Sequence, residues 1–286
     1  GFGAAIGLWA EWWSGEVLIV LSGMLCTQDV SAMLSQKGAE DNAALDVGTC
    51  TGGAVTAALW NTGATCWLIH GGFAIATPTR MGNALGAGDA EAARFSAKVG
   101  ATLQTLVGAT ASLALFVGRY RYGELFSLEG EALALMGTLM PLANVVQLGI
   151  AAGCGALRSI LTGLTIVSVP AVVQVVAFWP IALLLGYTLA FKAGLGVVGL
   201  WVGEAIGYAV MVAGLSVVMG RVDWQKKAQE AKMRASKDHS VYDAVAEDDF
   251  KIVGDLELDE GEQAQLLHNM PSSALKNPPR ETSPRE

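Results

Sequence analysis

Charged residues are scarce over most of this sequence. They make up 15% of its 286 residues, whereas a typical soluble domain carries about 25%. Only eight Lys/Arg and twelve Asp/Glu fall in residues 1–220, and ten and fourteen fall in residues 221–286. A soluble surface needs more charge than the first part has. We therefore expect residues 1–220 to lie in a lipid bilayer and the remainder to lie outside it.

Features that would indicate other classes of protein are missing. No phosphate-binding loop, nucleophile–base pair or metal-ligand cluster is visible, so a soluble enzyme is a poor fit and we expect no cofactor. The net charge of −8 and the lack of a cationic stripe argue against a nucleic-acid partner. The four cysteines lack zinc or redox spacing. We interpret them as small buried residues, although a Cys26–Cys50 bridge stays open.

Long apolar stretches are what the sequence does contain. A helix needs about 20 mostly apolar residues to cross about 30 Å of hydrocarbon. Six stretches qualify, at residues 2–26, 48–76, 99–118, 132–152, 164–191 and 194–219, with an acidic loop at 27–47 and a glycine-rich link at 77–98. We predict an all-α, polytopic membrane protein. Its six-helix lobe spans 1–220, and its cytoplasmic tail at 221–286 is helix-prone at 223–237 and largely disordered beyond.

Basic residues near the span ends predict the orientation, because positively charged segments stay cytoplasmic. With the C-terminus inside, ten Lys/Arg lie on the cytoplasmic side and four lie outside. The inner set is Arg80, Arg94, Lys98, Arg158, Arg221, Lys226, Lys227, Lys232, Arg234 and Lys237, and the outer set is Lys37, Arg119, Arg121 and Lys192. This imbalance predicts a cytoplasmic C-terminus.

Glycine and proline positions predict packing and bending within the spans. Small residues at four-residue spacing allow helix backbones to approach closely. The clearest cases are Gly3/Gly7, Gly149/Gly153 and Gly199/Gly203/Gly207. Pro141, Pro170 and Pro180 lie inside apolar spans, where each removes a backbone hydrogen bond and permits a kink.

Carboxylates inside apolar spans are the main candidates for chemistry, since such a charge costs about 2.5–3.5 kcal/mol at the bilayer centre. Glu11 and Glu16 lie about 140° apart around the first helix and ~7.5 Å apart along it. We expect one to face a central cavity and the other a neighbouring helix. A low dielectric favours the protonated form, so protonation could release a cationic substrate and deprotonation recruit one. The alternative is a solvated Glu11 at the headgroup boundary.

Two further ionisable residues lie inside predicted spans. For Glu204, in the last span, we expect a hydrogen bond to a neighbouring helix. For His70, in the second span, we favour a packed histidine with satisfied hydrogen bonds over a titrating group.

Several motifs resemble one family. The string Arg80-Met-Gly-Asn-Ala-Leu-Gly-Ala-Gly88-Asp89 resembles the Arg-Val-Gly-Asn-Ala-Leu-Gly-Ala-Gly loop of the multidrug and toxic compound extrusion (MATE) family. Glu11-Trp12-Trp13-Ser14-Gly15-Glu16 resembles the Glu-Trp-Trp-Ser-Tyr-Glu element that starts the seventh helix of eukaryotic members. Leu157-Arg158, Pro180, the segment 194–201 and Trp224 follow in the family's order. The resemblance covers about residues 5–235 and implies helices seven to twelve of twelve.

The resemblance implies a secondary antiporter that exports organic cations, xenobiotics or metabolites in exchange for H+ or Na+ by alternating access. Glu11 and Glu16 fall on the family's first two acidic positions in this half, and Asn61 and Gln147 stand where mammalian-type members carry glutamates. With Glu204, taken from its place inside an apolar span, they form the predicted coupling set. The implied gating loop is Arg80, Gly82, Asn83, Gly86 and Gly88. The chain departs from the family pattern at His70, at 158–163, and at Gln174 and Val175, which replace a tyrosine pair.

Partners and membrane follow from the same comparison. We expect a fragment whose N-terminal lobe is missing, in the plasma membrane or a vacuolar or endosomal membrane. A non-transporting truncated membrane protein acting in assembly or regulation is the alternative. In the tail, Glu262, Leu266 and Leu267 fit an acidic dileucine signal and residues 242–245 fit a tyrosine-based signal for clathrin adaptors. Plain solvated tail is the default interpretation.

Overall fold

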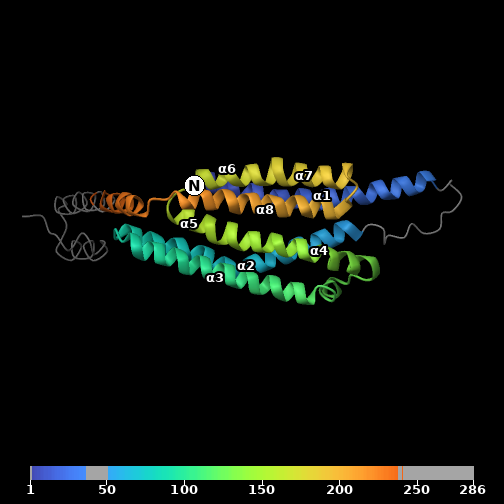
Figure 1. Ribbon diagram of the computed structural model, residues 1–286, viewed down its shortest axis with the longest axis horizontal. Coiled ribbons are helices and arrows are strands. Elements are labelled where there is room, and N and C mark those ends of the chain that lie inside the picture. Colours follow the sequence, from blue (N-terminus) through green and yellow to red (C-terminus); the bar gives the residue numbers. More distant parts are fainter. Residues whose placement is uncertain (1, 37–50, 238–239, 241–286) are drawn as a thin grey trace, which may run out of the picture.

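The computed structural model describes the backbone of residues 2–36, 51–237 and 240, and their side chains except at 2–4 and 26–36. Long helices run side by side along an elongated molecule (Figure 1). The elements are α1 Phe2–Gln36, α2 Thr51–Gly86, α3 Ala90–Gly118, η2 Tyr122–Phe126, α4 Gly130–Gly149, η3 Ile150–Leu157, α5 Arg158–Gly163, α6 Ser168–Val176, η4 Ala177–Leu183, α7 Leu184–Tyr187, η5 Thr188–Lys192 and α8 Gly196–Gly220. A further helix covers residues 224–237. In the described part of the chain every regular element is helical, which confirms the all-α prediction.

These elements form six rods within the described residues, in the order of the six predicted spans. Elements α4, η3 and α5 are continuous, as are α6, η4, α7 and η5. Four rods are long and apolar enough to cross a membrane by length and composition, namely Ala90–Gly118, Gly130–Gly163, Ser168–Lys192 and Gly196–Gly220. Helices α1 and α2, of 35 and 36 residues, are longer than these four rods but are not among them.

The predicted link at 77–98 is wrong, because most of it is helical. Helix α2 continues to Gly86 and α3 begins at Ala90. The turn between them is short: Gly88 has φ +83°, and the carboxylate of Asp89 accepts the backbone N–H of Ala92 at 2.8 Å, which caps α3. Met81 and Leu85 are buried, so packing overrides the weak helix propensity of the neighbouring glycines.

The predicted acidic loop at 27–47 is also shorter than expected. Helix α1 continues to Gln36, and residues 37–50 lie outside the described residues. Cys26 and Cys50 lie outside the described side chains too, so the bridge between them is untested. Cys66 and Cys154 are free and buried, as predicted for small apolar residues.

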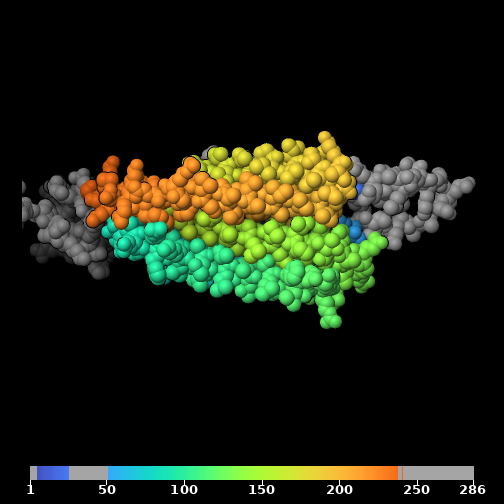
Figure 2. All heavy atoms as spheres, in the orientation of Figure 1, coloured from blue at the N-terminus to red at the C-terminus, as the bar shows by residue number. Residues whose placement is uncertain are grey.

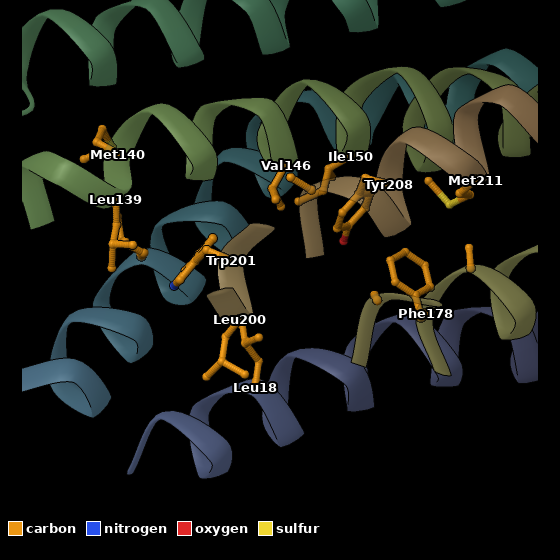
Figure 3. Packing of buried hydrophobic residues seen from close by; sticks show 14 of the residues in the cluster. Leu18, Leu139, Met140, Val146, Ile150, Phe178, Leu200, Trp201, Tyr208 and Met211 are labelled. Carbon is orange, nitrogen blue, oxygen red and sulfur yellow. The ribbon is translucent and has the colours of Figure 1, made fainter. Parts of the chain in front are cut away.

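The core surrounds α8, which packs against α4, η3, η4, α7 and η5. Large side chains of α8, including Trp201, Tyr208 and Met211, are almost fully buried with Phe178 and Leu18 (Figure 3). The rings of Phe178 and Tyr208 meet edge to face with centroids 4.9 Å apart. Burial of aromatic rings on this scale positions α8 firmly between the other rods.

Glycine faces allow this close packing, as predicted for two of the three sets. A Cβ atom at Gly203 would lie 2.5 Å from backbone atoms of Gly186. Gly199 and Gly207 meet the same rod, while Gly149 and Gly153 face the side chains of Tyr208 and Met211. The third set is only partly described, since the surroundings of Gly3 lie outside the described side chains. Substituting Gly199 or Gly203, where the added Cβ atom would meet backbone atoms, would force helices apart.

The prolines differ in their effect on the rods. Pro141 lies inside α4, and Pro180 lies in η4, a π-helical segment whose wider turn accommodates a missing backbone donor. Pro170 is the third residue of α6, where the backbone N–H has no intrahelical partner in any case. The predicted loss of a hydrogen bond at Pro170 is therefore wrong. Pro78, inside α2, was not predicted to lie in a helix.

Candidate functional site

Glu11 lies on the inner face of α1. The buried residues of this helix recur at spacings of three and four, at Gly7, Ala10, Glu11, Ser14, Gly15, Leu18 and Ser22. This spacing is one face of an α-helix. The stripe that packs α1 against the bundle therefore carries the Glu11 carboxylate inside, and Glu11 is only 6% exposed. The alternative of a solvated Glu11 is wrong.

Four side chains from three other rods surround the Glu11 carboxylate. The Cys154 thiol donates to Oε1 at 2.8 Å, and the Tyr208 hydroxyl donates to the same oxygen at 3.3 Å. The Gln174 amide donates to Oε2 at 3.3 Å, and a guanidinium nitrogen of Arg158 lies 3.7 Å from Oε2. A buried carboxylate is tolerated when it is paired and hydrogen-bonded. This cluster meets both conditions.

Small residues make room for these polar groups. A Cβ atom at Gly7 would lie 2.3 Å from the side-chain oxygen of Gln174, and one at Gly149 would lie 2.6 Å from Cβ of Tyr208. Cys154 lies in η3, a π-helical segment that ends where Arg158 begins α5. Such segments are frequent at functional sites. The glycines thus shape both the packing and the polar cluster.

A second carboxylate lies close behind the first. Glu204 of α8 is fully buried, and the Ser14 hydroxyl lies 3.4 Å from its Oε1 and 2.7 Å from the backbone oxygen of Glu11. Glu204 therefore accepts a hydrogen bond from a neighbouring helix, as predicted. Its other oxygen, Oε2, has no hydrogen-bond partner among the described residues. Ser14 links the segment of α1 that carries Glu11 to the carboxylate of α8.

A small pocket opens beside Glu11. Its wall includes Trp12, Trp60, Gln147, Trp201 and Tyr208, and its volume is about 40 Å³. That volume holds water, since one water needs roughly 10–15 Å³ by this measure. The amide groups of Gln147 and of Asn144, also in the wall, have no hydrogen-bond partner within the described residues. The pocket therefore combines aromatic surface, unpaired amides and one carboxylate.

The structure brings together only part of the predicted coupling set. Glu11 and Gln147 line the pocket, and Glu204 lies one side chain away. Glu16 is exposed, because five positions rotate it away from the buried stripe of α1. Glu11 is thus the glutamate that faces neighbouring helices, and whether Glu16 faces a central cavity stays a prediction. Asn61 is also exposed, and its amide donates to the backbone oxygen of Ala57 at 2.8 Å.

The predicted gating residues lie at one end of the bundle, away from this pocket. Arg80, Gly82, Asn83 and Gly86 belong to the last two turns of α2 and not to a loop, and Gly88 alone lies in the turn. A Cβ atom at Gly88 would lie 2.8 Å from the Lys232 side chain, so this turn contacts the helix at 224–237.

The contacts of Glu11 include residues that the sequence did not indicate. Tyr208 and Cys154 carry no motif, and Arg158 and Gln174 stood out only as positions of a family pattern. The glycine pair at 149 and 153 predicted that another helix packs closely on that face. It could not tell that the approaching side chain is a tyrosine whose hydroxyl reaches a carboxylate on a third helix.

A separate polar cluster lies between α2, α3 and α5. His70 and Gln104 are fully buried, and the Gln104 amide donates to the Ser159 hydroxyl at 3.5 Å. Neither ring nitrogen of His70 has a hydrogen-bond partner in the described part of the chain. The prediction of a packed histidine is confirmed, but its expected hydrogen bonds are not found there. Among described residues no group of three or more His, Cys, Asp and Glu could hold a metal ion.

Comparisons with known proteins agree with this arrangement. The MatE family matches residues 52–188. Multidrug and toxin extrusion protein 1 of Mus musculus is 28% identical over 79% of this chain and 36% of its own length. Protein DETOXIFICATION 13 of Arabidopsis thaliana is 30% identical over 78% of this chain and 42% of its own length. The chain thus spans less than half the length of these relatives.

A solved structure gives the same assignment for the fold. The crystal structure of the eukaryotic MATE transporter AtDTX14 matches with a TM-score of 0.69 at 24% identity, over 82% of this chain and 48% of that one. Together with its apolar helices, these matches identify an integral, multi-pass membrane protein. Over the part that they cover, the chain matches the MATE family, whose members among these relatives are transporters rather than enzymes.

Proposed function

We propose that this chain is the C-terminal half of a secondary antiporter that exports organic cations, xenobiotics or metabolites in exchange for H+ or Na+. The observation that carries the proposal is the buried carboxylate of Glu11, which lies in the wall of an aromatic pocket and contacts three other rods. Aromatic faces attract organic cations, and a carboxylate supplies the countercharge. Both groups are present beside this pocket.

Coupling follows from competition for the same carboxylate. A proton, a sodium ion and an organic cation each neutralise Glu11, so binding of one reduces the affinity for another. Protonation also removes the charge that holds Arg158 and turns one carboxylate oxygen into a donor. The hydrogen bonds to Cys154, Gln174 and Tyr208 would then rearrange, and with them the rods that carry these residues. Glu204 and Gln147 would serve this site as neighbours of Glu11.

The exposed residues Glu16 and Asn61, the orientation of the chain and the tail signals belong to the same proposal. We propose that Glu16 and Asn61 line a cavity shared with an N-terminal lobe, because both are exposed on this chain. We place the C-terminus in the cytoplasm, because the ends of the rods carry unequal numbers of Lys/Arg. The Tyr242 and Leu266 sorting signals lie outside the described residues, and their recognition by clathrin adaptors stays a prediction.

Transport by the complete protein tests the proposal. The measurement is efflux of a fluorescent organic cation from vesicles, driven by an imposed pH gradient or an imposed sodium gradient. We expect Glu11→Gln to lower the gradient-driven rate at least about tenfold, since an amide cannot exchange a proton. Glu131→Gln, at an exposed position in the first turn of α4, is the matched control. A Glu11→Gln protein that transports like wild type would contradict the assignment.

A further inference from the structure

Lysines and arginines gather at one end of the bundle. This is the end where α2, α5 and α8 finish and where α3 and α6 begin (left in Figure 1). Among residues with described side chains it carries ten Lys/Arg and four Asp/Glu, whereas the opposite end carries three of each. The ten are Arg80, Arg94, Lys98, Arg158, Arg221, Lys226, Lys227, Lys232, Arg234 and Lys237. The two ends therefore differ strongly in their attraction for anions.

The helix at 224–237 is held in place at this basic end. Its Ala228 is 1% exposed and packs in a cluster with Met81, Leu85 and Ala90 at the α2–α3 turn. Arg234 lies 3.4 Å from the Thr165 hydroxyl in the α5–α6 connection. In the space-filling view this helix lies directly against the tip of α2 and α3 (Figure 2). The helix therefore presents its cations from a defined position.

Most of these cations are free to bind a partner. Arg158 pairs with Glu11, and Lys227 pairs with Glu230 at 2.9 Å. The other eight are exposed and form no ion pair within the described part of the chain. We call these eight the basic collar: Arg80, Arg94, Lys98, Arg221, Lys226, Lys232, Arg234 and Lys237.

Apolar side chains lie among the cations of the collar. Phe95 is 67% exposed beside Arg94, and Met233 is 65% exposed between Lys232 and Arg234. Arg221 directly follows the last residue of α8, which is one of the apolar rods. Cations next to a membrane span are attracted to anionic lipid by about 1 kcal/mol each. A lipid surface also accepts exposed apolar side chains, which a purely acidic peptide does not.

We propose that the basic collar binds the headgroups of anionic phospholipids and thereby holds the helix at 224–237 and the α2–α3 turn at the membrane surface. The proposal goes beyond transport, because it concerns the lipid partner of this end and not the solute. The chain offers one rival for the same surface. Residues 247–262 contain eight Asp/Glu and one Lys, and they follow the collar in the sequence.

The test uses the whole chain in nanodiscs of phosphatidylcholine, with or without phosphatidylserine. Backbone hydrogen exchange of residues 224–237 is measured by mass spectrometry at low and high salt. We expect phosphatidylserine to slow exchange in this helix by roughly tenfold at low salt and much less at high salt, because salt screens surface charge. Equal exchange in the two lipids at low salt would overturn the proposal.

Two sets of variants identify the partner. Arg221→Gln, Lys226→Gln and Lys237→Gln combined should remove the phosphatidylserine effect, while Arg119→Gln, Arg121→Gln and Lys192→Gln at the opposite end should leave it intact. Unchanged exchange in α8 serves as the measure that each variant is folded. A third variant replaces the eight acids of 247–262 by Asn and Gln. If this variant loses protection from exchange in phosphatidylcholine, and wild type does not respond to phosphatidylserine, the collar binds the acidic tail segment. That result would overturn lipid binding.

Discussion

The two faces of α1 place the same chemical group in opposite surroundings. Glu11 is 6% exposed and contacts Cys154, Arg158, Gln174 and Tyr208. Glu16 lies five residues later and is exposed, on a side of the helix that also presents Trp9 and Trp13. The comparison shows that rotation about a helix axis, and not residue type, decides whether a carboxylate becomes part of a buried network.

A buried and an exposed carboxylate also differ in how strongly the stability of the chain depends on their protein partners. A carboxylate in low dielectric needs a cation and hydrogen-bond donors, and removing one partner of a fully buried ion pair costs about 3–5 kcal/mol. An exposed carboxylate obtains the same stabilisation from water. We therefore expect substitutions on the inner face of α1 to change stability, and substitutions on the outer face of this chain to leave it almost unchanged.

The largest expected effect comes from comparing a glycine on the inner face of α1 with a glycine on its outer face. A Cβ atom at Gly15 would lie 1.8 Å from the Trp60 ring, whereas a Cβ atom at Gly23 has nothing within 4 Å. We expect Gly15→Leu to destabilise the chain by about 3 kcal/mol or more, since overpacking displaces α1 from α2. Gly23→Leu is the matched control and should cost less than about 0.5 kcal/mol. Thermal unfolding in detergent measures both, and equal melting temperatures would break the comparison.

The next effect concerns the ion pair of the inner face. We expect Arg158→Gln to destabilise the chain by about 2 kcal/mol, below the value for a fully buried pair, because the Arg158 side chain is 18% exposed and lies 3.7 Å from Glu11. Adding Glu11→Gln should recover most of that loss, because no uncompensated charge then remains.

A double-mutant cycle on urea or detergent denaturation gives the coupling energy of this pair. Additive losses in the double variant would show that Arg158 and Glu11 do not stabilise each other. The same cycle with Glu16→Gln in place of Glu11→Gln is the control, and we expect it to give a coupling energy near zero.

The smallest effect concerns one hydrogen bond. Tyr208→Phe removes the hydroxyl 3.3 Å from Glu11 and retains the edge-to-face contact with Phe178. We expect a loss of about 1 kcal/mol. Tyr187→Phe, where the ring stacks on Phe191 at 4.7 Å and the residue is 40% exposed, should change stability very little. Indistinguishable melting curves for the two variants would argue against the Tyr208–Glu11 bond.

Much of the fold could be predicted from composition and spacing. Apolar stretches of about 20 residues located all six rods, and the four-residue spacing of glycines located the faces of α8 and of the α4–η3 rod that pack closely. These features are local, because a helix satisfies its own backbone hydrogen bonds and exposes a periodic surface. The predicted link at 77–98 was wrong, because the packing of Met81 and Leu85 stabilises the helix by more than the glycines destabilise it.

The candidate site was harder to predict. The sequence singled out both Glu11 and Glu16, and their separation of about 140° showed only that they differ in direction. Burial of Glu11 depends on Gln174, Cys154 and Tyr208, which lie 163, 143 and 197 positions away along the chain. For His70, too, the sequence predicted burial but could not predict that neither ring nitrogen has a hydrogen-bond partner among the described residues.

The sequence by itself determined that this protein is a set of apolar helices with carboxylates inside them and cations at one end. Helix formation, lipid compatibility and charge segregation depend on neighbouring residues, so a linear pattern records them. Only the tertiary structure decided which carboxylate is enclosed, which side chains meet it, and that the helix at 224–237 docks beside the α2–α3 turn. These outcomes depend on contacts between distant segments, whose geometry is set when the rods pack together.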